Sequence, residues 1–535
     1  MRFDERLKKC SREQLWQEYC GFLDMSLSDY MYTQRRLMEE QMRLWCASGL
    51  GQKLLQGKQP RTIEEFREML PLTSYADYAD VLLARRGDML CAEPTVWIQT
   101  TWEGGLRPIK LAPYTRGMLD RYRHNLLSTM MMASAKKKGD FDIKPGYRIL
   151  YGGAPLPYAT GLTPSLLDED IHYEWLPDAN AHSDLSFSQR IKKGFSMAMS
   201  GGVDYFFSIG SVANYITESF GQTSGRHSGK LNISIGNALR YLRAKYVCKR
   251  DGRALRPGDI FHLRAFFYGG TDARCYKDRL TAAWGIVPTE AVLGTESTCL
   301  GSETWEHNGM LLFPDSCFYE FIPSEEMSRN LEDPSYTPRT CLMDGVVSGE
   351  DYELVLSVFH GGAFMRYRIG DVYRCLSAGN GTLPRFSFVD RAPDVIDIAS
   401  FTRITEASVQ EVVNLSGLSV GDWLMKKEYD EKSNPFLHMY LEIPPEAQGR
   451  EVAVKQVLQE HLSVYFRYFD SDYGDLKKLL NMEPLQLTVL RYGTISGYEK
   501  MLGRSLHRIN PGMLDVMGLL QYQSHPAVPE GGGRP

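Results

Sequence analysis

A carboxylate at a break in a strand is the first feature of this sequence that could do chemistry. Residues 367–371 read Tyr-Arg-Ile-Gly-Asp, and Gly370 interrupts an otherwise strand-like pattern. The β-branched and aromatic run Leu354–Phe359 comes before it, and Gly361-Gly362 separates the two, which predicts an antiparallel hairpin. Asp371 would then stand at the strand break, where a carboxylate can face a ligand. A plain turn aspartate is the alternative.

A second carboxylate follows a glycine at the end of an apolar run. Ala291–Leu293 predicts a strand that leads directly into Gly294, Thr295 and Glu296. Glycine lets the backbone approach a ligand closely, and Mg²⁺ prefers one or two carboxylates together with phosphate oxygens. Glu296 is therefore the candidate metal ligand, and an acidic surface turn is the alternative.

A loop between two short strands is the third candidate. The strands are predicted over residues 95–101 and 109–115. Thr100 and Thr101, followed by Gly104, can offer hydroxyl and backbone N–H donors to phosphate oxygens. A plain hairpin is the alternative. The glycine-rich segment 221–230 lacks the spacing of a phosphate-binding P-loop, and we interpret it as a loop.

A short polar connector predicts a hinge. Asp390-Arg391 follows a third predicted strand, Phe386–Val389, and a further ordered block begins near Asp394. A hinge needs only a few residues at the end of an element. We therefore predict two domains, 1–389 and 390–535, in which residues from about 523 onward are disordered because they are rich in Pro and Gly.

These motifs resemble a known family. Tyr367–Asp371, followed by Asp390-Arg391 and Thr405-Glu406, is similar to the end of the large domain and the hinge of adenylate-forming enzymes. The Tyr-Arg-x-Gly-Asp motif is most similar to that of the auxin-responsive promoter family, the acyl-acid amido synthetases. Gly294–Glu296 resembles the Gly-x-Thr-Glu motif of these enzymes, and Phe318–Pro323 resembles their Tyr-Phe-Glu-Phe-Ile-Pro strand. The segment 61–82 resembles their entry segment.

The resemblance implies roles for these residues. Asp371 would bind the ribose hydroxyls of ATP, Arg391 would lie near the ribose and phosphates, Thr295 would contact the AMP phosphate, and Glu296 would hold Mg²⁺. The substrates besides ATP would be a small carboxylic acid, activated as an acyl-AMP, and an amine, such as an amino acid, that accepts the acyl group.

The sequence departs from the family in four places. Gly294 directly precedes Thr295, one residue closer than in the family motif, and Val292 and Leu293 stand where the family has an aromatic residue. Trp102-Glu103 replaces part of the usual Ser/Thr-Gly-Thr phosphate loop, and the lysine expected in the C-terminal lid stands in no clean motif, with Lys500 and Arg508 as candidates. Two alternatives therefore stay open. One is an acyl-activating enzyme with coenzyme A as acceptor, and the other is a binding or scaffold protein that keeps the fold without catalysis.

Composition sets the broader limits. A chain of 535 residues predicts more than one domain, and the alternation of strands and helices over 95–290 favours α/β layers. The resemblance implies that the large domain combines a β-barrel with α/β layers and that the lid is a smaller α+β domain. A net charge of −5 argues against nucleic acid as the main partner. The absence of an apolar run near 20 residues, and of a signal sequence, predicts no membrane partner.

Ten scattered cysteines without a C-x-x-C pair predict reduced thiols in a cytoplasmic protein. Helices are predicted after two capping residues, Ser11 and Thr62, and the second of them should end before Pro71.

Overall fold

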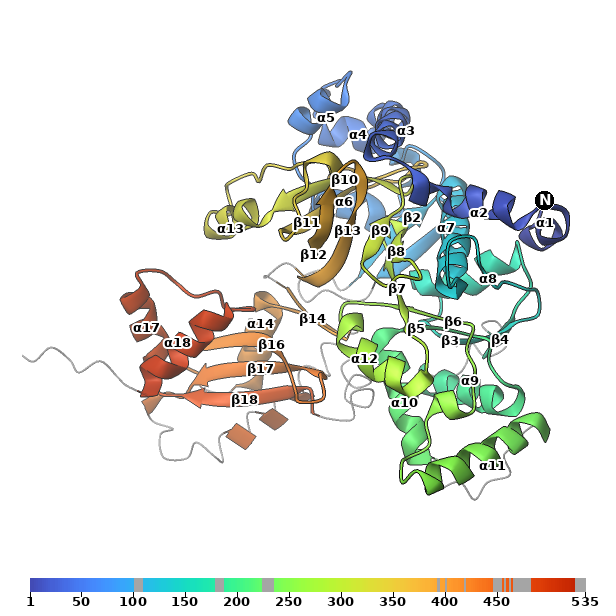
Figure 1. Ribbon diagram of the computed structural model, residues 1–535. Coiled ribbons are helices and arrows are strands. Elements are labelled where there is room, and N and C mark those ends of the chain that lie inside the picture. Colours follow the sequence, from blue (N-terminus) through green and yellow to red (C-terminus); the bar gives the residue numbers. More distant parts are fainter. Residues whose placement is uncertain are drawn as a thin grey trace, which may run out of the picture. The chain divides into compact units, whose positions relative to one another are not determined.

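The computed structural model describes two compact units of the chain (Figure 1). The first comprises residues 1–100 and 109–390, and the second begins at Arg391. The described residues are 1–100, 109–178, 187–223, 235–391, 395–399, 402–417, 420–445, 483–524 and the helical pairs 455–456, 459–460 and 463–464.

The helices and strands of the first unit alternate along most of its length. Its helices are α1 (Phe3–Lys9), α2 (Arg12–Cys20), α3 (Leu27–Ala47), α4 (Gly49–Leu54), α5 (Ile63–Met69), α6 (Tyr75–Leu83), α7 (Arg116–Ser134), α8 (Thr163–Asp168), α9 (Phe187–Gly201), α10 (Gly210–Thr223), α11 (Ile235–Arg250), α12 (Ala273–Trp284) and α13 (Ser324–Glu332). Its strands are β1 (Val96–Thr100), β2 (Lys110–Tyr114), β3 (Arg148–Gly152), β4 (Glu174–Leu176), β5 (Tyr205–Ile209), β6 (Ala265–Gly269), β7 (Thr289–Gly294), β8 (Thr298–Glu303), β9 (Met310–Leu312), β10 (Cys317–Pro323), β11 (Asp351–Val358), β12 (Tyr367–Gly379) and β13 (Thr382–Arg391).

The predicted helix caps form. The Ser11 hydroxyl accepts a hydrogen bond from the Gln14 amide, and the Gln14 side chain accepts one from the Ser11 amide, which makes a capping box at the start of α2. Thr62 caps α5 by accepting from the Glu65 amide at 3.1 Å. Helix α5 ends at Met69, as the proline at 71 predicts.

One eleven-stranded sheet runs through the described part of the first unit, in the order β10-β11-β12-β13-β9-β8-β7-β6-β5-β3-β4. The strands from β4 to β7 pair in parallel, and β7, β8 and β9 continue as antiparallel neighbours. Where we expected a β-barrel beside α/β layers, the described antiparallel strands extend the same sheet. Strands β1 and β2 form a separate hairpin.

The parallel strands are buried on both faces. Phe207 and Phe267 stack at 4.6 Å and belong to the core on the side of α7. Phe206 and Phe266 point the other way, against Trp284 of α12. Strands covered on both faces read as continuous apolar runs, and β5 and β6 do so.

The second unit is a small α+β domain. Its elements are β14 (Val395–Ile398), β15 (Thr402–Thr405), α14 (Glu406–Ser416), β16 (Trp423–Tyr429), β17 (Pro435–Glu442), β18 (Leu485–Leu490), α17 (Thr494–Leu502) and α18 (Met513–Ser524). Val409 and Val412 of α14 share a core with one face of β16–β18, and residues of α17 and α18 share a core with the other. The predicted disordered tail begins two residues inside α18, and the rest of that tail lies outside the described residues.

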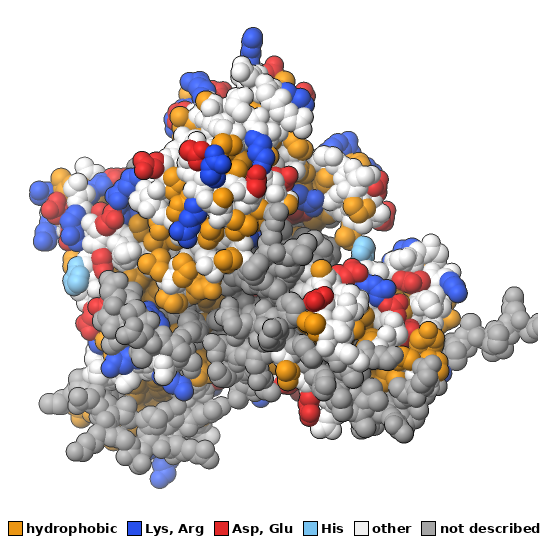
Figure 2. All heavy atoms as spheres, turned by 180° about the vertical axis from the view of Figure 1, so that it is seen from behind, with side chains coloured by type: hydrophobic (Ala, Val, Ile, Leu, Met, Phe, Trp, Pro, Cys, Tyr) orange, Lys and Arg blue, Asp and Glu red, His pale blue; other side chains and the backbone are white. Residues whose placement is uncertain are grey.

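Acidic and basic side chains are interspersed over the described surface drawn in Figure 2. Across the described residues, every helix is too short or too polar to cross a bilayer.

Candidate active site

The turn after β7 is built around a glycine. Gly294 pairs with Thr298 of β8, and a Cβ atom at Gly294 would lie 2.3 Å from the Ser297 hydroxyl, so a larger residue there would require the Ser297 side chain to move. The phenol of buried Tyr114 donates to the carbonyl of Thr295 at 2.7 Å and to that of Gly294 at 3.3 Å. Burial, together with Tyr122 and Glu296, raises the pKa of Tyr114, which keeps this donor protonated.

Glu296 turns its carboxylate toward strand β12. The Tyr367 phenol donates to Glu296 Oε1 at 3.3 Å, and the side chain of Glu296 is only 8% exposed. The Lys110 ammonium donates to the same phenol at 3.4 Å. A polar chain thus connects Lys110, Tyr367 and Glu296, which come from three separate segments of the sequence. Lys110 was absent from our candidates because nothing in its local sequence marks it.

Asp371 lies on a bulge in β12. Val355 of β11 pairs with Arg368, and Glu353 pairs with Val372, so Leu354 alone faces three residues of β12. Gly370, the middle residue of the three, has φ +78°, a conformation that favours glycine. Bulges re-aim side chains next to functional sites. The predicted strand break at Gly370-Asp371 is therefore present, and Asp371 is buried there.

The turn after β7 and the bulge lie side by side. A Cβ built on Gly294 would come within 3.5 Å of the side chain of Ile369, the first bulge residue. With the Tyr367–Glu296 hydrogen bond, this contact brings together two motifs that are more than 70 residues apart in sequence. The predicted strand Phe318–Pro323 is β10, at the far end of the antiparallel run from β7.

The loop candidates are only partly described. Thr100 is buried at the end of β1 and pairs with Lys110 across the hairpin. Thr101 and Gly104 lie outside the described residues, so their proposed contact with phosphate stays a prediction. Because Thr100 faces Lys110, the described base of this loop adjoins the Lys110–Tyr367–Glu296 chain.

Arg391 belongs to the second unit. Its guanidinium pairs with the buried carboxylate of Asp397 in β14 at 3.4 Å. The predicted connector Asp390-Arg391 is the end of β13 rather than a loop, because polar side chains do not by themselves end an extended backbone, and the two units divide between these residues. Residues 392–394, which follow the predicted connector, lie outside the described residues, and the hinge stays a prediction.

The two lid candidates differ in their surroundings. Arg508 pairs with Asp422 and lies 3.6 Å from a Glu406 oxygen, and its guanidinium covers the Trp423 ring. Lys500 is exposed on α17. Arg508 is thus held in a network within the second unit, whereas Lys500 extends into solvent.

The donor set suits a magnesium–nucleotide complex. Glu296 is a single buried carboxylate, which matches an ion that takes most of its ligands from phosphate and water. Among the described residues, no group of three or more His, Cys, Asp or Glu side chains could form an all-protein metal site. Glu296 would therefore hold Mg²⁺ only together with substrate oxygens.

Comparisons with known proteins bear on the fold and on the segment that contains β12. Residues 310–391 match the family model described as the GH3 family central domain. The search of curated proteins gives no match. Among solved structures, the acyl acid amido synthetase AtGH3.15, in complex with 2,4-DB, is similar at 15% identity and a TM-score of 0.50, over 95% of this chain and 96% of that chain.

A second similar structure is 2-hydroxyisobutyryl-CoA ligase in complex with 2-HIB-AMP and CoA, at 16% identity and a TM-score of 0.57, over 93% of this chain and 92% of that chain. At these identities the solved structures establish the fold, and the family model identifies the segment that contains β12 and its bulge. The comparisons support the resemblance seen in the sequence: this chain has the fold of these two solved structures, and its residues 310–391 match the GH3 family central domain.

Proposed function

We propose that this protein is an ATP-dependent ligase that joins a carboxylic acid to an amine, with an amino acid as the acceptor. In the first half-reaction a carboxylate oxygen attacks the α-phosphorus of ATP, the bond to pyrophosphate breaks, and acyl-AMP forms. In the second, the neutral amine attacks the acyl carbon, AMP leaves, and the nitrogen loses a proton. The observation that carries the proposal is the hydrogen bond between Tyr367 and Glu296, which joins the two nucleotide motifs.

Each residue contributes a distinct interaction to this reaction. Asp371, aimed by the bulge, would accept hydrogen bonds from the ribose hydroxyls. The Thr295 hydroxyl, on a turn whose carbonyl is fixed by Tyr114, would contact the α-phosphate. Glu296 would hold Mg²⁺, which offsets the charge that develops on the phosphates.

Lys110 adds positive charge beside this carboxylate. Its ammonium reaches the Tyr367 phenol and lies 5.5 Å from the Tyr75 ring. Fixed cations near the phosphates stabilise the charge of the transition state. We propose that Lys110, together with Thr100, Thr101 and Gly104, orients the phosphates.

Arg391 would act in the second half-reaction. Its pairing with Asp397 couples the last residue of β13 to β14 of the C-terminal unit. We propose that this unit moves between the half-reactions, and that Arg391 repositions it. Residues at the end of an element can absorb such a change.

The test is pyrophosphate release with Mg·ATP across a panel of carboxylic acids, each with no acceptor, with a mixture of amino acids, and with coenzyme A. We expect acid-dependent release and an amide product with the amino acids. A thioester product would favour the second candidate, an acyl-CoA ligase, which the similarity to the CoA ligase fold motivates. A protein that binds Mg·ATP but releases no pyrophosphate with any acid would instead be a scaffold that has lost catalysis.

A further inference from the structure

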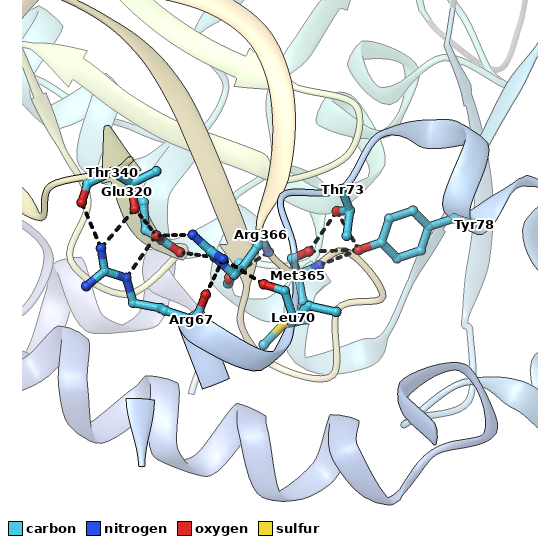
Figure 3. Close-up of polar contacts among 9 residues, drawn as sticks. Arg67, Leu70, Thr73, Tyr78, Glu320, Thr340, Met365 and Arg366 are labelled. Atoms are coloured by element: carbon cyan, nitrogen blue, oxygen red, sulfur yellow. Dashed lines mark hydrogen bonds and ion pairs between the residues drawn. The ribbon is translucent and has the colours of Figure 1, made fainter. Parts of the chain in front are cut away.

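A buried ion network lies next to the candidate site, at the residue that precedes Tyr367. Figure 3 shows Arg366 reaching Glu320, with Arg67 and Thr340 on the far side of the same carboxylate. Arg366 and Glu320 form two parallel hydrogen bonds, Nε to Oε1 at 3.0 Å and Nη2 to Oε2 at 3.1 Å. Paired bonds of this kind fix direction as well as distance.

Glu320 is surrounded by donors. The Arg67 Nε donates to its Oε2 at 2.9 Å, and the Thr340 hydroxyl donates to the same oxygen. Burial opposes ionisation of this carboxyl, but Arg366, Arg67 and Thr340 outweigh it and hold the pKa of Glu320 below its usual value. The carboxylate is therefore charged, and it binds two guanidinium groups from distant segments.

Arg366 also closes the end of helix α5. Its Nη1 donates to the carbonyl of Leu70 at 2.6 Å and to that of Arg67. These carbonyls belong to the last turn of α5, where a helix lacks internal donors and presents its negative end. One side chain, from the residue just before β12, thus contacts both β10 and the end of α5.

The backbone at Arg366 is in the left-handed region, with φ +49°. An arginine pays a steric penalty there that glycine would avoid. The backbone conformation alone would therefore favour glycine at this position. The hydrogen bonds of the Arg366 side chain to Glu320 and to the carbonyls of α5 must outweigh the strain of the backbone. The Arg366 guanidinium contacts the end of α5, and the phenol of the next residue, Tyr367, contacts Glu296.

A second set of contacts fixes the neighbouring backbone. The Thr73 amide donates to the Arg366 carbonyl at 2.8 Å, and the Arg368 amide donates to the Thr73 carbonyl at 2.9 Å. The Thr73 hydroxyl and the Tyr78 phenol both donate to the Met365 carbonyl at 2.8 Å (Figure 3). Residues 365–368 are thereby held from both sides, immediately before the bulge that carries Asp371.

We propose that the Arg67–Glu320–Arg366 network is a positioning device for the nucleotide site. Arg366 acts through its neighbours and not on substrate. It fixes the backbone of residues 365–368, and thereby both the position at which the Tyr367 phenol contacts Glu296 and the point at which the bulge that carries Asp371 begins. The proposal rests on the proposed function for its ligand, ATP, but the position of the segment can be measured without any ligand.

The test compares two glycine substitutions in the same region of the chain. Arg366→Gly removes the anchor and suits the left-handed backbone, so the strain falls while the network is lost. Arg374→Gly is the matched control, because Arg374 also forms a two-bond pair, with Asp351, but on the solvent side of β12. Hydrogen exchange of the amides in 365–371 and the Kd for Mg·ATP are measured for both variants and the wild type.

We expect Arg366→Gly to speed exchange in 365–371 and to raise the Kd by about tenfold or more, whereas Arg374→Gly leaves both near the wild-type values. Arg366→Lys, which keeps the charge, should recover part of the loss. Equal effects of the two glycine variants, or an unchanged segment and Kd in a folded Arg366→Gly protein, would overturn the proposal.

The test also covers a variant that does not fold and a wild type that binds no Mg·ATP. If Arg366→Gly does not fold, Arg366→Lys is measured in its place, because a lysine keeps the charge but cannot form both parallel hydrogen bonds to Glu320. An unchanged segment and Kd in that variant would then overturn the proposal. If the wild type binds no Mg·ATP, the proposed function fails, and the exchange of 365–371 alone still decides whether Arg366 holds this segment.

Discussion

Glu290, at the start of β7, should make the stability of the first unit depend on pH. It is 7% exposed, and its amide donates to the Glu303 carboxylate at 3.0 Å. Burial, followed by repulsion from Glu303, raises the pKa of Glu290 from 4.5 to about 7, although Lys277 and Arg274 oppose the rise. Tyr268 of the adjacent strand β6 and His307, which contacts Glu303, belong to the same cluster.

The sign follows from which state binds the proton more tightly. The folded state holds the Glu290 proton to a higher pH than the unfolded chain, so ionisation favours unfolding, and stability falls as pH rises from about 4.5 to about 7. The full loss is about 3 kcal/mol. About 1 kcal/mol of this stability has already been lost at about pH 5.5, so about 2 kcal/mol more should be lost between about pH 5.5 and 8.

Glu290→Gln mimics the protonated carboxyl and should remove this loss. We expect the variant to exceed the wild type in free energy of unfolding by about 2 kcal/mol more at about pH 8 than at about pH 5.5, measured by urea unfolding. Glu332→Gln, at an exposed position on α13, is the control and should shift neither value. A Glu290→Gln advantage that stays constant across this range would refute the reasoning, because the carboxyl would then not titrate differently in the two states.

Three predictions concern the nucleotide site. Asp371→Ala should weaken ATP binding by about 2–4 kcal/mol, since two hydrogen bonds to a charged acceptor are lost, and calorimetry on the folded variant checks this; unchanged affinity would remove Asp371 from the site. Glu296→Gln should lower acid-dependent exchange of pyrophosphate into ATP by at least about tenfold, and an undiminished rate across a magnesium titration would mean that Glu296 is not the ligand. Arg391→Ala should reduce single-turnover acyl transfer more than pyrophosphate exchange, and equal effects on both steps would count against a moving C-terminal unit.

The sequence by itself determined the local features of the site. Gly294 lies in close contact with Ser297, and Gly370 has a positive φ. Each of these conditions depends only on residues two or three positions away in the sequence. Helix caps and the β11–β12 hairpin are equally local, and they form as predicted. The family motif at residues 367–371 is also short and local. The adenylate-forming fold could therefore be identified from the sequence.

Only the tertiary structure decided which side chains meet. Lys110, Glu296 and Tyr367 come together because the β1–β2 hairpin and strand β12 converge on the turn after β7, and no periodicity in the sequence encodes that convergence. Arg366 and Arg67 likewise share the Glu320 carboxylate across 46 and 253 positions of sequence. A charged residue has the same local pattern whether it faces water or a buried partner, because its partner is chosen by the packing of distant segments.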